Sequence, residues 1–369
     1  MVLSNGCHEE VGAAGRRREA RRAGRRAAPV VKAFLGLAGG LAVLAAAAAV
    51  QAQTPPDRFS RVSGAVLDVA PPMARVSGAR GAIVVRNTGC ISRPLDQIRR
   101  RMVDISVQEW AAAGFQTIDA AVLSSRRVPD GVLPDALNPH RSHPFHPRAL
   151  IQFGLWEVEP AMDRVIAGYW AATPGGAAVI ARQNQEWRQG EGEQNWVQPW
   201  SAAFISWTVC EAGLAEPSRF RRDVSHRTYI DQAIRVRDGR GTGAYTAYSP
   251  GERPLVPGDL LCNTRGGLVY RNLGDRRRHL GQGAPTHCDI VVRVAGDRVA
   301  VIGGNVIQSV SLTILPLSDR SGSNHPHPVL PADASGAHPI FAHLSLNAAP
   351  IEAEAMDASP TIAALNGRP

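Results

Sequence analysis

Hydrophobic residues recur at helical spacing in three segments of the chain. The first runs from Leu95 to about Ala113 and carries its apolar positions at Ile98, Met102, Ile105 and Trp110. A second segment covers Glu159 to Ala172, and a third covers Ser201 to Ala212. The third is apolar almost all round, which is typical of a buried helix. Glycines follow the first and third segments and predict where those helices end, at Gly114 and Gly213.

Beyond residue 250 the pattern changes to short runs of β-branched and apolar residues. These runs predict strands separated by turns such as Pro257-Gly258-Asp259 and Ala295-Gly296-Asp297. The expected strands are Asp259–Cys262, His287–Val294, Arg298–Ile302 and Ser309–Leu315. Helices that precede a meander of strands indicate an α+β fold, with N-terminal helices packed on an antiparallel β-sheet.

Residues 1–52 have the pattern of a secretory signal sequence. Arginines dominate residues 1–32, an uncharged apolar stretch follows from Ala33 to Val50, and small residues occupy the −3 and −1 positions of Val50-Gln51-Ala52. We expect cleavage after Ala52 rather than a retained anchor, because alanine and glycine replace leucine at most apolar positions. The mature protein is then periplasmic or secreted, and it meets the membrane only through the signal sequence before cleavage.

Composition divides the rest of the chain into three parts. Residues 53–80 are rich in Pro, Ser, Ala and Gly and predict a flexible linker. Residues 81–345 hold the expected helices and strands and form the folded domain, with a proline-rich loop at 127–148. Residues 346–369 predict a loose C-terminal tail.

The net charge of +9 does not indicate a nucleic-acid-binding protein. Part of that charge lies in the leader, and all but one of the 41 basic residues are arginines, which suits a GC-rich genome. A DNA-binding surface would cluster basic residues among aromatic ones, and the sequence has no such cluster. We therefore expect no nucleic-acid partner.

Four cysteines follow the leader, at Cys90, Cys210, Cys262 and Cys288. In an oxidising compartment they indicate one or two disulfides, with three possible pairings. Cys262 and Cys288 lie on strands expected to be neighbours, so we expect these two to be close enough to bond. The sequence has no Cys-x-x-Cys pair, and the grouped histidines lie among prolines in loops, so we expect no metal and no cofactor: His140, His143, His146, His325 and His327.

Three short motifs place polar residues at the ends of the expected elements. They open the third helix (199–205), begin the second strand (286–292) and end the third strand (302–306). Their order resembles the papain-type amidohydrolases of the bacterial envelope, the CHAP and NlpC-type peptidases. In closer detail the chain is similar to the bacterial family called domain of unknown function 2272, over most of residues 95–320. The stretches that carry this similarity are Glu109-Trp110, Val165–Trp170, Trp200–Trp207, Ser225–Ile230, Pro257–Cys262, His287–Val292 and Ile302–Val310.

The resemblance implies a papain-like fold and an exported hydrolase that acts on peptide or amide bonds of peptidoglycan. At the position of the usual cysteine nucleophile this chain has Ser201. A serine gains less than a cysteine from a helix N-terminus, and it must lose its proton to a base during attack. Serine is also a preferred helix N-cap. The nucleophile and the cap interpretations of Ser201 both stay open.

His287 is the expected catalytic base. A three-residue loop at Ala295–Asp297 sets His287 opposite Asn305, and directly opposed residues have Cβ atoms ~4.5–5.5 Å apart. A two-residue loop would shift the partner by one position, and Gly303-Gly304 could add a bulge. Asn305 is therefore the expected orienter of the imidazole, and Asp289 is a second candidate for that role. Cys288 points to the other face of the strand and is expected to be structural.

Three residues are expected to line the substrate cleft: Trp200, His226 and Asp289. The run from Arg276 to Arg278 lies in the loop between the first two strands, where an arginine could meet a carboxylate of a wall peptide.

Two other classes of function fit the same residues. One is a catalytically silent papain-like domain that binds wall peptides or a periplasmic partner. The other is a structural periplasmic protein in which Ser201 is only a cap. The serine favours these two classes, whereas His287 and Asn305 favour the hydrolase.

Overall fold

The computed structural model describes residues 61–120, 150–190, 195–319, 323–329 and 339–366, and the predicted signal sequence and the loop at 127–148 lie outside them. The helical elements are α1 (Gly64–Leu67), the 3-10 helix η1 (Pro72–Arg75), α2 (Leu95–Ala112), α4 (Pro160–Ala171), α5 (Gly176–Gln189), α6 (Ser201–Ala212), α7 (Arg227–Arg237), α8 (Leu273–Arg277) and α9 (Pro360–Asn366). The strands are β1 (Val76–Ser77), β2 (Val84–Val85), β3 (Thr117–Asp119), β4 (Leu150–Gln152), β5 (Tyr245–Tyr248), β6 (Leu260–Thr264), β7 (Thr286–Ala295), β8 (Arg298–Val306), β9 (Ser309–Ser318), β10 (His327–Pro328) and β11 (Ile340–Leu346).

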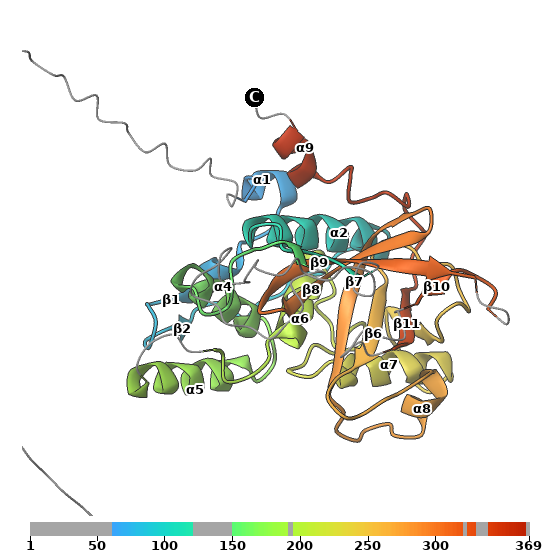
Figure 1. Ribbon diagram of the computed structural model, residues 1–369. Coiled ribbons are helices and arrows are strands. Elements are labelled where there is room, and N and C mark those ends of the chain that lie inside the picture. The colour runs from blue at the N-terminus through green and yellow to red at the C-terminus, as the bar shows by residue number, and fades with distance from the viewer. Residues whose placement is uncertain (1–60, 121–149, 191–194, 320–322, 330–338, 367–369) are drawn as a thin grey trace, which may run out of the picture. The chain divides into compact units, whose positions relative to one another are not determined.

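One large sheet organises these elements, in the order β4-β3-β9-β8-β7-β6-β11-β5, with β10 beside β9 (Figure 1). Its pairs are antiparallel except for β3 with β9. The expected α+β class and the antiparallel sheet are confirmed. The four strands expected from the sequence are β6 to β9, and β11 lies between β6 and β5 although it comes last in the chain.

The apolar helix expected at Ser201 to Ala212 is the centre of the core. Every residue of α6 is buried. The helix packs against α2 and α4 on its sides and against β7 and β8 of the sheet. It ends at Gly213, which has a φ of 116° that favours glycine. Because α6 is held on all sides, the position of its first residue, Ser201, is fixed.

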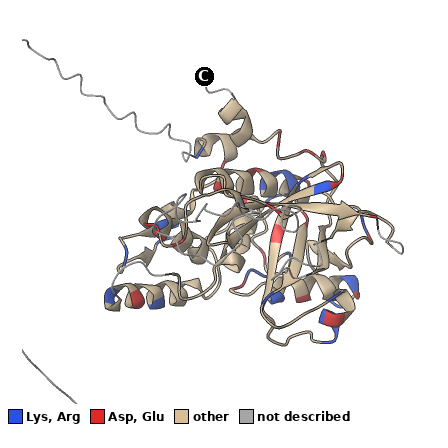
Figure 2. Ribbon diagram, viewed as in Figure 1, with Lys and Arg blue, Asp and Glu red and all other residues tan. Residues whose placement is uncertain are grey.

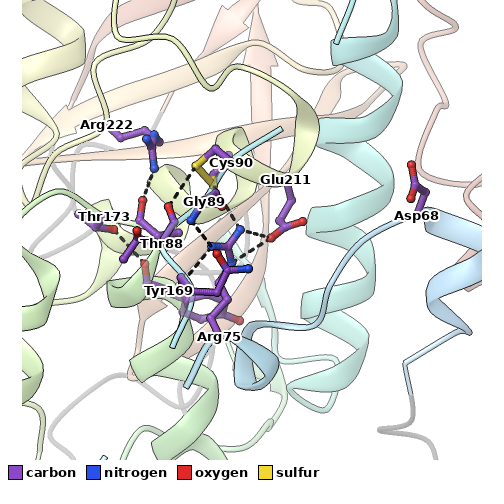
Figure 3. A network of polar contacts seen from close by, with 12 residues as sticks. Asp68, Arg75, Thr88, Gly89, Cys90, Tyr169, Thr173, Glu211 and Arg222 are labelled. Carbon is purple, nitrogen blue, oxygen red and sulfur yellow. Dashed lines mark hydrogen bonds and ion pairs between the residues drawn. A yellow bond between two sulfur atoms is a disulfide. The ribbon is translucent and has the colours of Figure 1, made fainter. Parts of the chain in front are cut away.

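The described part of the predicted linker is folded onto the domain. Residues 61–80 contain α1, η1 and β1, and Leu67, Val69 and Val76 are buried in the core. The buried Arg75 guanidinium donates from Nε and Nη2 to Glu211 Oε1, at 3.0 and 2.5 Å (Figure 3). These elements are one helical turn or two residues long, too short to produce a detectable hydrophobic period.

The predicted tail also has packed residues. Ala355 and Ser359 are fully buried, and α9 contacts α2. The backbone of the segment bonds to β7, since Val294 N–H donates to the Ala353 carbonyl at 2.7 Å. Its Ala- and Pro-rich composition resembles that of a loose tail, but small residues also allow close backbone contact with a strand.

Two disulfides join distant parts of the described chain. Cys262 and Cys288 face each other on β6 and β7 and are bonded, which confirms the expected proximity. Cys90 is bonded to Cys210 of α6 (Figure 3). Within the described residues, no helix is both long and apolar enough to cross a membrane.

Candidate functional site

Ser201 is the first residue of α6, and its hydroxyl does not cap the helix. Trp200 occupies the N-cap position, and no side-chain hydrogen bond caps this end of α6. The Ser201 Oγ instead lies 2.7 Å from His226 Nε2. The interpretation of Ser201 as a helix N-cap is therefore wrong.

His226 immediately precedes α7, and the start of that helix holds its ring. Tyr229 lies three residues further on, on the same helical face, and its hydroxyl is hydrogen-bonded to His226 Nδ1. The imidazole thus connects Tyr229 to Ser201 through its two nitrogens. The sequence suggested only that His226 lines the cleft, whereas the structure puts it in direct contact with Ser201.

His287 is held by Asp289 rather than by Asn305. The His287 Nε2 lies 2.7 Å from Asp289 Oδ1 on the same strand. The orienting role thus passes to the second candidate of the sequence analysis. With Nε2–H donated to the carboxylate, the neutral ring carries its lone pair on Nδ1, and that buried atom has no hydrogen-bond partner among the described residues.

Asn305 takes part in a different contact. It lies at a register shift between β8 and β9 and has a φ of 56°. In the amide orientation that satisfies its neighbours, its side-chain oxygen accepts hydrogen bonds from the backbone N–H and the indole N–H of Trp200, each at 3.1 Å. Asn305 therefore fixes the residue before Ser201 rather than the base.

Trp200 is buried in the core next to Ser201 and does not line a cleft. Its side chain is fully buried and stacks on Tyr169 at a ring distance of 5.8 Å. Its indole N–H also donates to Glu157 Oε2 at 2.7 Å. Burial raises the pKa of the Glu157 carboxyl, and the hydrogen bonds from Trp200 and Trp196 oppose that change. The expectation that Trp200 binds substrate is replaced by a positioning role.

Two adjacent glycines of β8 let the parts of the site approach each other. A Cβ on Gly303 would lie 1.8 Å from Asp289 Oδ1, and a Cβ on Gly304 would lie 2.4 Å from the Phe204 Cβ of α6. Any larger residue at Gly303 would displace the carboxylate that holds His287. Any larger residue at Gly304 would push the first turn of α6 away from the sheet.

The two histidines of the site lie side by side in a low-dielectric environment. The His226 and His287 ring centroids are 5.2 Å apart. Burial lowers the pKa of His226 well below its ordinary value, and electrostatic interaction with His287 and with the Arg265 guanidinium lowers it further. Burial also lowers the pKa of His287, as does Arg265, whereas Asp289 acts in the opposite direction. Both rings are therefore neutral at neutral pH and are able to accept a proton.

These side chains are nearly buried. Ser201 is 8% exposed, Asp289 9%, His226 3% and His287 2%. Within the described ranges, no three His, Cys, Asp or Glu side chains gather in a way that would hold a metal ion. The arrangement supplies a hydroxyl, a neutral base in contact with it and a second neutral base beside the first.

Sequence reasoning missed the contact between His226 and Ser201. The available signal was the three-residue spacing of His226 and Tyr229 ahead of an amphipathic segment. That spacing predicts a His–Tyr contact on one helical face, but not where the face points. The placement of α7 against α6 and β7 depends on tertiary packing.

Comparison with known proteins supports the family resemblance. Residues 158–329 match the family described as an uncharacterized protein conserved in bacteria (DUF2272), as the sequence motifs predicted. The matched region contains Ser201, His226, His287, Asp289 and Asn305, whereas Glu109-Trp110 lies before it. No curated protein and no solved structure matches the chain.

Proposed function

From the DUF2272 match and the contact between Ser201 and His226, we propose that the protein is an exported serine hydrolase of papain-like architecture that cleaves peptide or amide bonds of peptidoglycan. One observation carries the catalytic part of the proposal. The Ser201 hydroxyl at the N-terminus of a buried helix lies 2.7 Å from a neutral imidazole nitrogen instead of capping the helix. A nucleophile needs this contact, because its proton must pass to a base during attack.

The proposed reaction uses His226 as the base. Ser201 Oγ attacks the carbonyl carbon of the scissile amide while its proton passes to His226 Nε2. The carbon–nitrogen bond then breaks, and the leaving nitrogen takes that proton. Water hydrolyses the acyl-serine and restores the Ser201 hydroxyl. For Nε2 to accept a proton, the neutral ring must carry its hydrogen on Nδ1 and donate it to the Tyr229 oxygen.

Two further features support this chemistry. The first N–H groups of α6 have no partner inside the helix, and its dipole favours negative charge at this end, where the oxyanion would form. His287 has Nε2 held by Asp289 and Nδ1 free to accept a proton, so it is suited to activate the water of the second step. In this proposal His226 accepts the proton in the first step, and His287, the base expected from the sequence, accepts the proton in the second.

The proposed place of action rests on the leader and the disulfides. Residues 1–52 have the pattern of a secretory signal. Disulfides persist in oxidising compartments, and the described residues hold two. A periplasmic or secreted hydrolase of this family meets peptidoglycan as its most abundant amide polymer.

The test is turnover of purified peptidoglycan, followed by mass spectrometry of the released fragments. We expect Ser201→Ala and His226→Ala each to reduce turnover by at least ~10²-fold, because nucleophile and base act as one unit. Ser201→Cys should retain activity, because a helix N-terminus and an adjacent imidazole favour the thiolate. Arg182→Ala, an exposed change on α5, is the matched control.

Each alternative gives a different result in the same assay. Wild-type protein that releases no fragment but binds wall fragments would identify the catalytically silent binder. If His287→Ala loses turnover while His226→Ala keeps full activity, His287 is the base that accepts the Ser201 proton, and the mechanism above is wrong.

A further inference from the structure

The end of β6 places two polar residues, Asn263 and Arg265, beside the catalytic groups. Asn263 pairs directly with His287, and Thr264 pairs with Thr286. Because successive side chains of a strand alternate between faces, Asn263 and Arg265 lie on the same face of the ladder as His287. Asn263 and Arg265 are two residues apart, so their backbones are ~7 Å apart along the chain.

Two buried polar atoms on this face have no partner among the described residues. They are Asn263 Oδ1 and His287 Nδ1. Buried polar atoms in folded proteins are almost always hydrogen-bonded, so these two atoms next to the catalytic groups are available to bind a ligand. The amide oxygen is an acceptor and calls for an N–H donor, which a peptide group supplies.

Arg265 adds a positive charge at the same place. Its side chain is exposed and forms no hydrogen bond or ion pair with the described residues. Its charge nevertheless acts on the site, since it lowers the pKa of His226 and of His287. Asp289 is already hydrogen-bonded to the His287 ring, and its negative charge also acts on Arg265 and opposes the lowering of the Arg265 pKa by desolvation.

The arginine run singled out in the sequence does not offer such a charge. Arg276 is paired with Asp231 at 2.7 Å, Arg277 with Asp238 at 2.7 Å and Arg278 with Asp275 at 2.6 Å. In Figure 2, basic and acidic residues accordingly alternate around α8 and α7. The carboxylate-binding role expected of this loop therefore falls to Arg265 instead.

We infer that Arg265 and Asn263 form a substrate subsite that binds a peptide carrying a free carboxylate next to the scissile bond. The Arg265 guanidinium would bind the carboxylate through charge-assisted hydrogen bonds, and Asn263 Oδ1 would accept a peptide N–H. This inference rests on the proposed function, because it assigns a substrate class to the same site. It predicts a hydrolase that prefers acidic or carboxyl-terminal peptide segments over uncharged ones.

The experiment compares two forms of one substrate pool. Soluble muropeptides are used as isolated, and a second sample has its carboxylates converted to amides with carbodiimide and ammonium. We expect Arg265→Ala to lower kcat/KM for the carboxylate form at least ~10-fold, mainly through KM, and to change it less than ~2-fold for the amidated form. Arg265→Lys should recover part of the loss, because lysine keeps the charge without the bidentate fork. Arg182→Ala, which removes an exposed arginine from α5, should change neither value.

Binding of the same two pools to Ser201→Ala protein separates this inference from the proposed function. If wild type cleaves both pools equally well, the carboxylate subsite is wrong and the hydrolase stands. If nothing is cleaved, but the Ser201→Ala protein prefers the carboxylate form and loses that preference when Arg265→Ala is added, the subsite stands and the hydrolase is wrong. Absence of a carboxylate preference in both assays overturns the inference.

Discussion

The role of the Ser201 hydroxyl follows from the residue that it contacts rather than from its being a serine at a helix start. A serine at a helix start usually accepts a hydrogen bond from the first turn. Here the residue sits one position inside the helix, and its hydroxyl lies against His226. A hydroxyl that does not cap its helix and instead contacts a buried neutral base is arranged for proton transfer.

The state of His226 predicts the pH dependence of turnover. Burial and electrostatic interaction with His287 and Arg265 lower its pKa, and a base must be neutral to act. We therefore expect the acid limb of the kcat/KM profile to lie below the ordinary histidine value of about 6.5. A pH–rate profile on soluble muropeptides measures it. An acid limb at or above pH 7 would contradict the assignment of His226 as the base.

The same pKa values predict how stability depends on pH. Because the pKa of both site histidines is lowered in the folded protein, the unfolded chain binds more protons below about pH 6.5. The free energy of unfolding should therefore decrease as the pH falls from 7.5 through 6, and it should decrease less steeply in His226→Gln. Urea unfolding of both proteins at several pH values measures the difference.

Two buried carboxyls change the free energy of unfolding with pH in the opposite direction. Their effect is the same in both proteins and cancels when the two slopes are compared. Burial raises the pKa of Asp104 and of Asp163 to about 6 each, so their contribution decreases as the pH rises from about 4 to 6. Both are present in wild type and variant alike. An equal slope in the two proteins would show that His226 does not titrate abnormally.

At the scale of elements, the β7–β8 hairpin shows what could be predicted and what could not. The strands were predictable from their β-branched runs, but the turn is Gly296-Asp297 between Ala295 and Arg298, one residue shorter than expected. A register shift between Val291 and Arg293 compensates, so Ile290 pairs with Ile302, as a three-residue loop would give. A short sequence does not reveal a bulge, because the extra residue is accommodated by backbone conformation and not by side-chain type.

The elements that were missed share a physical reason. The helix α5 has few buried positions, and half of its residues are polar. The strand β11 is buried in the middle of the sheet but was not predicted, because its seven residues follow a long stretch without periodicity. By contrast α2, α4 and α6 carry apolar residues that the core requires, and their bounds were predictable to within one or two residues.

Gly303 predicts a specific effect on the site. Gly303→Ala would place a Cβ 1.8 Å from Asp289 Oδ1 and displace the carboxylate from His287. We expect turnover to fall at least ~10-fold, because the His287 ring loses its orienting partner. Gly267→Ala, where an added Cβ meets nothing within 4 Å, is the control. Unchanged turnover in Gly303→Ala would mean that the Asp289 contact does not matter for catalysis.

The disulfide between β6 and β7 predicts a stability effect next to the site. Cys262 and Cys288 are fully buried, and Cys288 adjoins His287 in sequence. Replacing both with alanine should lower the free energy of unfolding by ~2–5 kcal/mol. Thermal unfolding of this variant and of the Cys90→Ala/Cys210→Ala variant compares the two bridges. A melting temperature equal to that of wild type would show that the bridge is dispensable.

At the scale of the whole molecule, the site is assembled from segments far apart in the chain. Ser201 begins α6, His226 precedes α7, His287 and Asp289 lie on β7, and Arg265 follows β6. The sequence identified Ser201 and His287 through the resemblance of their motifs, His226 through the segment Ser225–Ile230, and Asp289 because it lies two residues beyond His287 on the same strand face. It did not show which histidine touches Ser201, because that depends on how two helix starts and one strand end converge in space.

The leader and the disulfides together make the last prediction, which concerns the compartment. The apolar stretch from Ala33 to Val50 and the small residues before Gln53 fit a cleaved signal, and the described domain carries two disulfides that need an oxidising environment to persist. Protein recovered from the periplasm of the expressing cell should therefore begin at or near Gln53 and contain both bridges by non-reducing peptide mapping. Ala52→Arg should block processing, because the −1 position accepts only small residues, and the product should stay in the membrane fraction. Wild-type protein that keeps its leader in washed membranes, or that carries free thiols at all four cysteines, would contradict export and with it the proposed access to peptidoglycan.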